Sequence, residues 1–259
     1  MPKLTVAKLA AEIKAGNIAP VYYFTGDDVY RKLEFANRIR AALVPDEFNF
    51  MREDGSGDIA GLLTAANTAP VFSARRVIVL NNADKIRKNT NAAAALARYL
   101  AEPLESTCLL VLHNDSKKSK KDKTFEDALA DIAVAADFAP LEGAQLFAWL
   151  RDKFKERGLN ADAAALEMLE ETAGGDLTAL SAEIEKLSLY LADREDKTVG
   201  DADVLASIGF GKEENPFALS NAVMNCDRAQ SLKLAGVLLA AGEEPVSVLN
   251  KISACAVKM

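Results

Sequence analysis

The chain has 259 residues, of which 50% are hydrophobic and 27% charged, a composition typical of a folded globular protein and not of a disordered or fibrous one. Its 31 basic and 38 acidic residues give a formal net charge of −7, which argues against a protein that slides freely along nucleic acid. A single histidine, His113, excludes any site that needs two. The longest aliphatic runs, Val77–Leu80 and Cys108–Leu112, are far shorter than the roughly 20 apolar residues of a membrane helix.

Three cysteines, Cys108, Cys226 and Cys255, are far apart in the sequence and surrounded by apolar residues. Their odd number and spacing favour buried thiols in a reducing cytosol over a disulfide framework or a metal site. The first residues carry scattered charges and lack the apolar core of a secretory signal. We therefore expect a cytoplasmic protein with no membrane partner.

In the first 140 residues, short apolar segments alternate with segments of helical periodicity. The strands are expected at Val21–Phe24, Phe48–Met51, Val77–Leu80, Cys108–Leu112 and Ala133–Phe138, and the helices at Asp28–Leu43, Asp58–Asn67 and Ala92–Leu100. Strands that are apolar on both faces and alternate with helices predict a parallel sheet covered by helices on both sides.

After Pro140 the pattern becomes helical, and we expect the strands to stop. Helices are expected over residues 143–157, 162–172, 176–192 and 201–207, followed by a charged, turn-rich linker at Gly209–Pro216. Three further helices are expected over 217–225, over 227–241 and from Pro245 onward. The sequence thus predicts an α/β domain at residues 1–140 and all-α segments at 141–209 and 210–259.

The turn after the first expected strand has part of the form of a phosphate-binding loop, G-x-x-x-x-G-K-[ST]. Gly26 and Lys32 have the spacing of that motif, but Arg31 takes the place of its second glycine and Leu33 the place of its hydroxyl residue. A bulky Arg blocks the close approach of phosphates, and Leu cannot bind Mg²⁺. The alternative is an ordinary strand–turn–helix in which the lysine falls at this spacing by chance.

A second segment, Val77–Asp84, has the form of the second ATPase motif, four apolar strand residues followed by a polar pair. ATPases need carboxylates in that pair to hold Mg²⁺ and to activate water, whereas this chain has Asn81 and Asn82. Together the two segments indicate a nucleotide-binding fold without the nucleotide site. Taken alone, two asparagines after a strand are an ordinary turn.

An apolar pair, Val71 and Phe72, follows Pro70 and precedes Arg75 and Arg76 at the start of the third expected strand. One interpretation is that the pair covers the local core. The other is an exposed apolar plug that anchors the protein in a pocket of a partner.

The segment Lys117–Lys123 contains five lysines in seven residues. Such a run could follow a phosphate backbone, but no aromatic residue interrupts it to stack on bases, and a solvated loop is the favoured interpretation. His113 ends an apolar strand without a second histidine or a neighbouring cysteine, so no metal site is expected there.

In order and spacing, several segments resemble the delta subunit of the bacterial DNA polymerase III clamp loader, a member of the AAA+ ATPase fold that has lost ATP binding. These segments are APVYYFTGDDVYRKLE (19–34), NTAPVFSARRVIVLNNADK (67–85), AGGDLTALSAEIEKLSLY (173–190), NPFALSNAV (215–223) and GEEPVSVLNKI (242–252). Each segment is short, but together they extend over nearly the whole chain.

The resemblance implies an AAA+-like clamp-binding domain at 1–140, a helical lid at 141–209 and a helical collar at 210–259. Because the family continues well beyond the last segment, we expect the collar to be truncated at Met259. The implied task is to bind the ring-shaped sliding clamp, the beta subunit, and open one of its interfaces. The family grips the clamp with an apolar pair at the tip of a helix, and Val71 and Phe72 fall on that position here. Pro70 stands where the family often has a small polar residue.

The implied partners are the clamp, the gamma/tau and delta-prime types of loader subunit, which meet the collar, and primer-template DNA in the assembled complex. No cofactor, no metal and no catalytic site are expected. Two other classes of function stay open, a nucleotide-hydrolysing AAA+ ATPase with a non-standard site and a nucleic-acid-binding scaffold that uses Lys117–Lys123. The missing carboxylates at Asn81 and Asn82 argue against the first.

Overall fold

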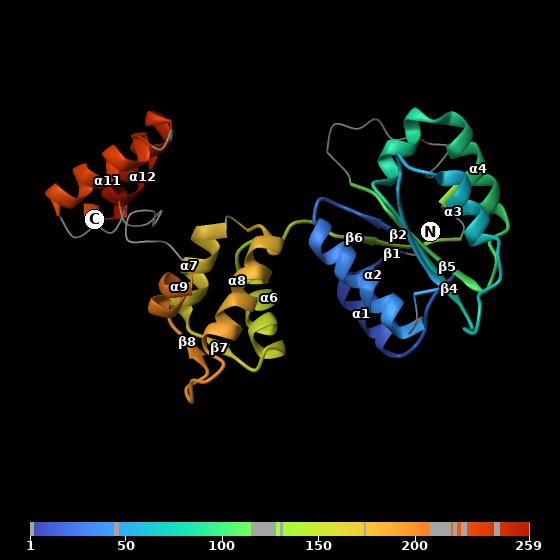
Figure 1. Ribbon diagram of the computed structural model, residues 1–259, viewed down its shortest axis with the longest axis horizontal. Coiled ribbons are helices and arrows are strands. Elements are labelled where there is room, and N and C mark those ends of the chain that lie inside the picture. Colours follow the sequence, from blue (N-terminus) through green and yellow to red (C-terminus); the bar gives the residue numbers. More distant parts are fainter. Residues whose placement is uncertain are drawn as a thin grey trace. The chain divides into compact units, whose positions relative to one another are not determined.

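The computed structural model of the chain forms two compact units, residues 1–141 and 142–259 (Figure 1). It describes residues 3–43, 47–114, 128–129, 132–173, 175–207, 219, 222–223, 227–240 and 244–258. Within these ranges, no helix is both long enough and apolar enough to cross a membrane. The expected linker Gly209–Pro216 lies outside the described residues, so the predicted boundary between lid and collar stays a prediction.

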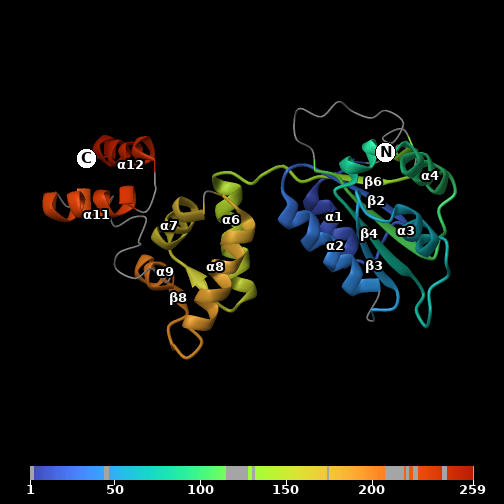
Figure 2. The same ribbon diagram turned by 45° about the horizontal axis from the view of Figure 1, so that its top comes forward.

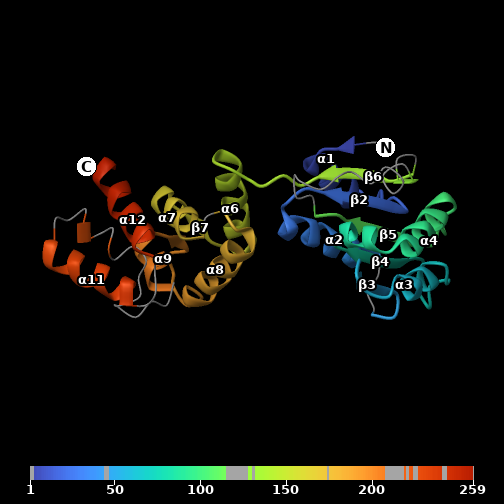
Figure 3. The ribbon, with the colours of Figure 1, turned by 90° about the horizontal axis from the view of Figure 1, so that it is seen from above.

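The first unit is built on a six-stranded sheet in which every strand pairs with its neighbour in parallel. The strand order is β1-β6-β2-β5-β4-β3, and Figure 3 shows the strands following one another in this order. In chain order the elements are β1 (Lys3–Leu4), α1 (Val6–Lys14), β2 (Val21–Thr25), α2 (Val29–Leu43), β3 (Phe50–Asp54), α3 (Ile59–Ala66), β4 (Arg76–Asn81), the 3₁₀ helix η1 (Ala83–Lys88), α4 (Thr90–Ala101), β5 (Thr107–Leu112) and β6 (Val134–Asp137).

The central strands are apolar on both faces because each face has its own layer of helices. Ile78, Leu80 and Val111 pack with the buried residues of α3 and α4. Val79 and Leu110, which point to the other face, pack with α1 and α2. Figures 1 and 2 show these two pairs of helices on opposite sides of the strands. The predicted parallel sheet with helices on both faces is confirmed.

The third strand differs from the expectation. It was expected at Phe48–Met51, but β3 runs from Phe50 to Asp54. Ahead of the strand, the Phe50 amide bonds to the carbonyl of Glu47, and the Asn49 side chain bonds to another segment of the chain. The short apolar run marks the beginning of this strand but not its polar end, which pairs with β4 up to Asn81. The strand β1 and the helix α1 were not among the expected elements.

The second unit is mostly helical. Its elements are α6 (Ala144–Glu156), β7 (Asn160–Ala161), α7 (Ala163–Ala173), α8 (Leu177–Tyr190), β8 (Thr198–Val199), α9 (Asp201–Ser207), α11 (Arg228–Ala240) and α12 (Pro245–Lys258). Leu150, Leu169 and Leu187, from three of these helices, are completely buried. The carboxylate of Asp176, directly before α8, caps that helix as expected. A separate apolar cluster joins Leu234 of α11 to residues of α12.

The expectation that no strand follows Pro140 is wrong for β7 and β8. These two-residue strands pair in parallel, Asn160 with Thr198 and Ala161 with Val199. A strand of two residues is too short to produce a period-two pattern, so sequence periodicity cannot reveal it.

Cys108 is the one described cysteine whose side chain the structure places, and its thiol is free and buried within β5. Burial raises the pKa of this thiol to about 12. In a chain that also carries Cys226→Ser and Cys255→Ser, we expect a thiol reagent at pH 8 to modify Cys108 only after denaturation, because the thiolate fraction in the folded protein is then about 10⁻⁴. Fast labelling of the native protein, measured by intact mass, would contradict this.

Candidate functional site

The lysine of the degenerate phosphate loop is buried and already bonded to the chain itself. Lys32 lies on α2 with 1% of its surface exposed. Its Nζ donates to the carbonyls of Gly26 at 2.6 Å and His113 at 2.8 Å, and to Oδ1 of Asn114 at 2.5 Å. These oxygens come from the ends of β2 and β5, so the ammonium ties α2 to the carboxyl edge of the sheet.

The other three positions of that motif have structural roles as well. Gly26 has φ +98°, and a Cβ there would lie 2.4 Å from the Phe138 carbonyl oxygen. The glycine therefore allows the turn to lie close to the backbone of Phe138 and not to a phosphate. Arg31 pairs with Asp28, which also caps α2, and donates to the Ala139 carbonyl. Leu33 is half-buried against the apolar cluster beneath α2.

The second motif belongs to a polar network along the same edge. Asn82, at the end of β4, accepts from Nδ2 of Asn114 and donates to the carboxylate of Asp54 at the end of β3. Hydrogen bonds from Ser56 and Asn82 hold the pKa of Asp54 well below its usual range. Lys85 lies 3.2 Å from the same carboxylate. Asn81 ends β4 and its carbonyl accepts from the Gly55 amide.

This edge therefore joins Lys32, Asn114, Asn82 and Asp54 in one chain of hydrogen bonds. The described ranges contain no cluster of three or more His, Cys, Asp or Glu that could hold a metal ion. His113 is buried at the end of β5, and its ring lies nearly perpendicular to that of Tyr23. The lysine-rich segment 117–123 lies outside the described residues.

The apolar pair Val71 and Phe72 is exposed to solvent. The exposed fraction of Val71 is 46%, and that of Phe72 is 102%, so its ring is not covered by the rest of the chain. Phe72 also has φ +57°, a left-handed backbone conformation that a bulky residue rarely adopts. The interpretation in which Phe72 covers the local core therefore does not describe this structure.

The resemblance implied that the pair lies at the tip of a helix. In the structure, the pair instead lies in the loop between α3 and β4. The helix ends at Ala66, and Pro70 both lacks an amide hydrogen and disfavours helical geometry in the preceding residue. Arg75 and Arg76, at the end of this loop, bond to backbone carbonyls of other segments. Arg75 donates to the Ile18 carbonyl at 2.8 Å, and Arg76 to the Ala65 carbonyl at 3.0 Å.

Sequence reasoning missed two residues beside this loop. Asn49 is fully buried, and its side-chain amide bonds to both backbone groups of Val71. Phe48, its neighbour in the chain, exposes 84% of its surface. A buried asparagine directly before a strand has no pattern that distinguishes it from an ordinary turn residue.

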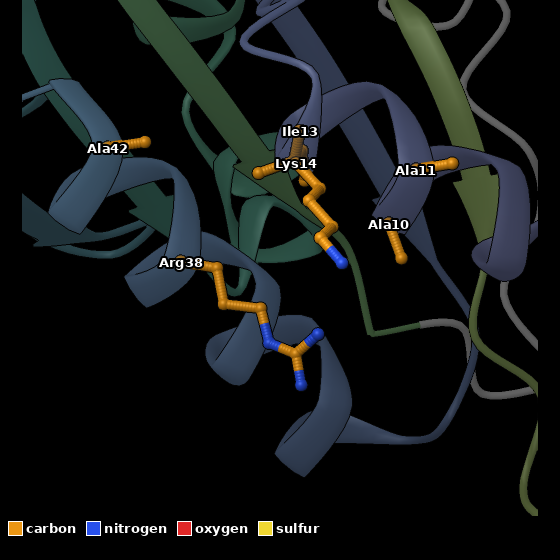
Figure 4. Close-up of a pocket in the computed structure, with 6 residues that line it drawn as sticks. All are labelled: Ala10, Ala11, Ile13, Lys14, Arg38 and Ala42. Atoms are coloured by element: carbon orange, nitrogen blue, oxygen red, sulfur yellow. The ribbon is translucent and has the colours of Figure 1, made fainter.

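A separate open hollow of about 470 Å³ lies between α1 and α2. Ala10, Ala11, Ile13, Lys14, Arg38 and Ala42 line it, and the side chains of Lys14 and Arg38 extend from the two helices (Figure 4). None of the residues singled out in the sequence contributes to this hollow.

Comparison with known proteins finds similarity to the family that the sequence segments resemble. A family model described as DNA polymerase III, delta subunit, matches residues 22–135. DNA polymerase III subunit delta of Bacillus subtilis is 28% identical over 251 residues, which cover 93% of this chain and 72% of that protein.

Solved structures agree with the sequence comparison. The structure of the Bacillus subtilis DNA clamp loader delta protein matches with a TM-score of 0.63 and 25% identity, covering 96% of this chain and 75% of that one. The Thermotoga maritima RuvB branch migration motor matches with a TM-score of 0.52 and 12% identity, over 92% of this chain and 88% of that one, and shows the AAA+-like fold alone. In sequence and in fold, the chain is therefore similar to the DNA polymerase III delta subunits.

Proposed function

We propose that this chain is the clamp-loader subunit that binds the sliding clamp and opens one of its interfaces, using no ATP of its own. The observation that carries the proposal is the fully exposed ring of Phe72, beside half-exposed Val71, on a loop fixed to the sheet by hydrogen bonds. An aromatic side chain that a folded protein leaves uncovered is the usual form of an anchor for a partner's apolar pocket.

The family supports this choice of partner. The Bacillus subtilis relative is described as a DNA clamp loader protein, and a loader must contact both the clamp and its fellow subunits. We propose that the AAA+-like unit, residues 1–141, carries the clamp-binding loop. Opening then follows if the bound clamp interface fits this rigid surface better in its open form than in its closed form, because only such differential binding shifts a conformational equilibrium.

We assign contacts with the gamma/tau and delta-prime types of subunit to the collar segment. Leu232 of α11 and Val246 and Leu249 of α12 expose more than half of their surface, while Leu234 and Val248 form the core between these helices. Such a face suits association with other helical subunits. Contact with primer-template DNA belongs to the assembled complex.

The direct test is a surface-binding assay in which this chain is passed over the immobilised clamp from the same organism. The proposal predicts saturable binding by the chain alone, without nucleotide. A gel-shift titration with double-stranded DNA at increasing salt separates the scaffold alternative, because a scaffold would bind DNA with a steep salt dependence in the absence of the clamp.

The polar network at the sheet edge supports the second part of the proposal, the lack of ATP binding. In calorimetry with Mg-ATP we expect no binding in the range of about tens of micromolar, because Lys32 is bonded to three oxygens of the chain and Asn82 supplies no negative charge for Mg²⁺. Binding of Mg-ATP with a dissociation constant in that range, and its loss in Lys32→Ala, would instead support the ATPase alternative.

A further inference from the structure

Asn49 makes an unusual pair of contacts with the loop that carries Phe72. Its Nδ2 donates to the Val71 carbonyl at 2.6 Å, and its Oδ1 accepts from the Val71 amide at 2.7 Å. One side-chain amide thus satisfies both backbone groups of a single residue, as a neighbouring strand would. Asn49 itself is completely buried, so its side chain is shielded from water.

The main chain of Asn49 fixes this contact to the sheet. Its carbonyl accepts from the Val77 amide at 2.8 Å, at the point where β4 begins to pair with β3. Asn49 therefore holds the segment from Val71 to Val77 at both ends, through its side chain at one end and its backbone at the other. Between these two points, Phe72 and Ala74 are exposed and the other residues are partly buried.

Phe72 needs such support because its own conformation is unfavourable. A left-handed backbone brings the Cβ of a non-glycine residue too close to the chain, and the fully exposed ring gains no packing within the chain. A conformation of this kind persists where the surrounding structure holds it. Val71, the residue directly before Phe72, is held on both of its backbone groups by Asn49.

We propose that Asn49 is a positioning residue of the clamp-binding loop, which fixes the backbone of Val71 so that the Phe72 ring projects into solvent in its binding conformation before the clamp arrives. This inference rests on the proposed function. Holding the loop in this way favours binding by preorganisation, because a loop that is already ordered loses less conformational entropy when it docks.

The first expected result concerns the loop in the free protein. The Val71 amide should exchange with solvent slowly although its side chain is half-exposed, and Asn49→Leu should accelerate that exchange at least about tenfold. Asn67→Ala is the matched control, since it removes a side-chain bond to the Leu63 carbonyl in the same connection and leaves Val71 untouched. Equal exchange of Val71 in the wild-type and Asn49→Leu chains would overturn the proposal.

The second expected result is a double-mutant cycle measured as clamp affinity. Asn49→Leu should weaken clamp binding about tenfold in the wild-type chain but less than about twofold in a chain that already carries Phe72→Ala, because both changes remove the same interaction. Asn67→Ala should change affinity less than twofold in either background. A purely structural role for Asn49 would lower affinity by the same factor in both.

The outcomes separate the two proposals. If Phe72→Ala weakens binding and Asn49→Leu has an equal effect in both backgrounds, or none in either, Asn49 does not position the ring and only this inference is overturned. If Phe72→Ala leaves clamp binding unchanged, the proposed binding site itself is wrong, and the role of Asn49 falls with it. Should Asn49→Leu not fold, Asn49→Asp, which keeps the acceptor for the Val71 amide and loses the donor, replaces it in both measurements.

Discussion

Replacing Phe72 by Ala is expected to weaken binding of the clamp by more than about thirtyfold. An aromatic anchor in an apolar pocket contributes about 2–4 kcal/mol, and each 1.4 kcal/mol changes the dissociation constant tenfold. Because the ring is fully exposed in the free chain, its removal should leave the fold intact. Val71→Ala should have a smaller effect of the same sign, since that side chain is half-exposed and smaller. Surface-binding titrations of the three chains measure both effects.

Leu189→Ala provides the matched control. Leu189, in the second unit, exposes 72% of its surface, so its truncation also removes an exposed apolar side chain but lies outside the clamp-binding loop. We expect this variant to bind the clamp as the wild-type chain does, and circular dichroism and melting temperature to be nearly the same for all variants. A Phe72→Ala chain that unfolds, while its folded fraction binds normally, would mean that the ring stabilises the fold.

Replacing Lys32 by Met is expected to destabilise the first unit by about 2–4 kcal/mol. The variant keeps the aliphatic stem but removes the donor from three oxygens, two of them backbone carbonyls, at the end of the sheet. Hydrogen bonds from a charged group contribute about 1.5–3 kcal/mol each, and relief of the buried charge offsets part of that loss. Urea unfolding, followed by near-ultraviolet dichroism of the tyrosines in the first unit, should show a midpoint lower by about 1 M or more.

Lys85→Met is the control for Lys32→Met. Lys85 also pairs with a group of the polar network, Asp54, but its side chain is 44% exposed. An ion pair this accessible to water contributes less than about 1 kcal/mol, so the midpoint should barely move. The fluorescence of Trp149, the single tryptophan, reports on the second unit and should be unaffected in both variants. Equal midpoints for Lys32→Met and the wild-type chain would show that the buried ammonium is not structural.

The sheet was predictable because its strands are buried on both faces. Val77–Leu80 and Cys108–Leu112 are unbroken apolar runs, and each lies inside a strand with only one or two additional residues. Burial of this kind leaves a strong signal in the sequence. Strand β3, at the edge of the sheet, has a mixed composition and was expected two residues too early, while β7 and β8 are too short for any periodic pattern.

The site was predictable in part. The sequence singled out Val71 and Phe72 but left open whether they face the core or solvent, because an apolar residue looks the same in either case. Only the fold shows that Pro70 and the bonds from Asn49 turn the pair outward. Likewise, the motif identified Gly26 and Lys32 without revealing their partners. Those partners, Phe138, His113 and Asn114, are more than 80 residues away in the chain and meet them through the parallel pairing of β2 with β5 and β6.

Photo-crosslinking from the loop tests most directly whether this chain binds the clamp through Phe72. Ala74 is exposed and follows Phe72 by two residues, so a p-benzoylphenylalanine at that position reports contact without removing the anchor. On irradiation with the clamp we predict a covalent adduct, suppressed by excess wild-type chain and not by excess Phe72→Ala chain, and no adduct from the same group at Leu189. An adduct from Leu189 but none from Ala74, in samples where the chain and the clamp elute together, would contradict the account.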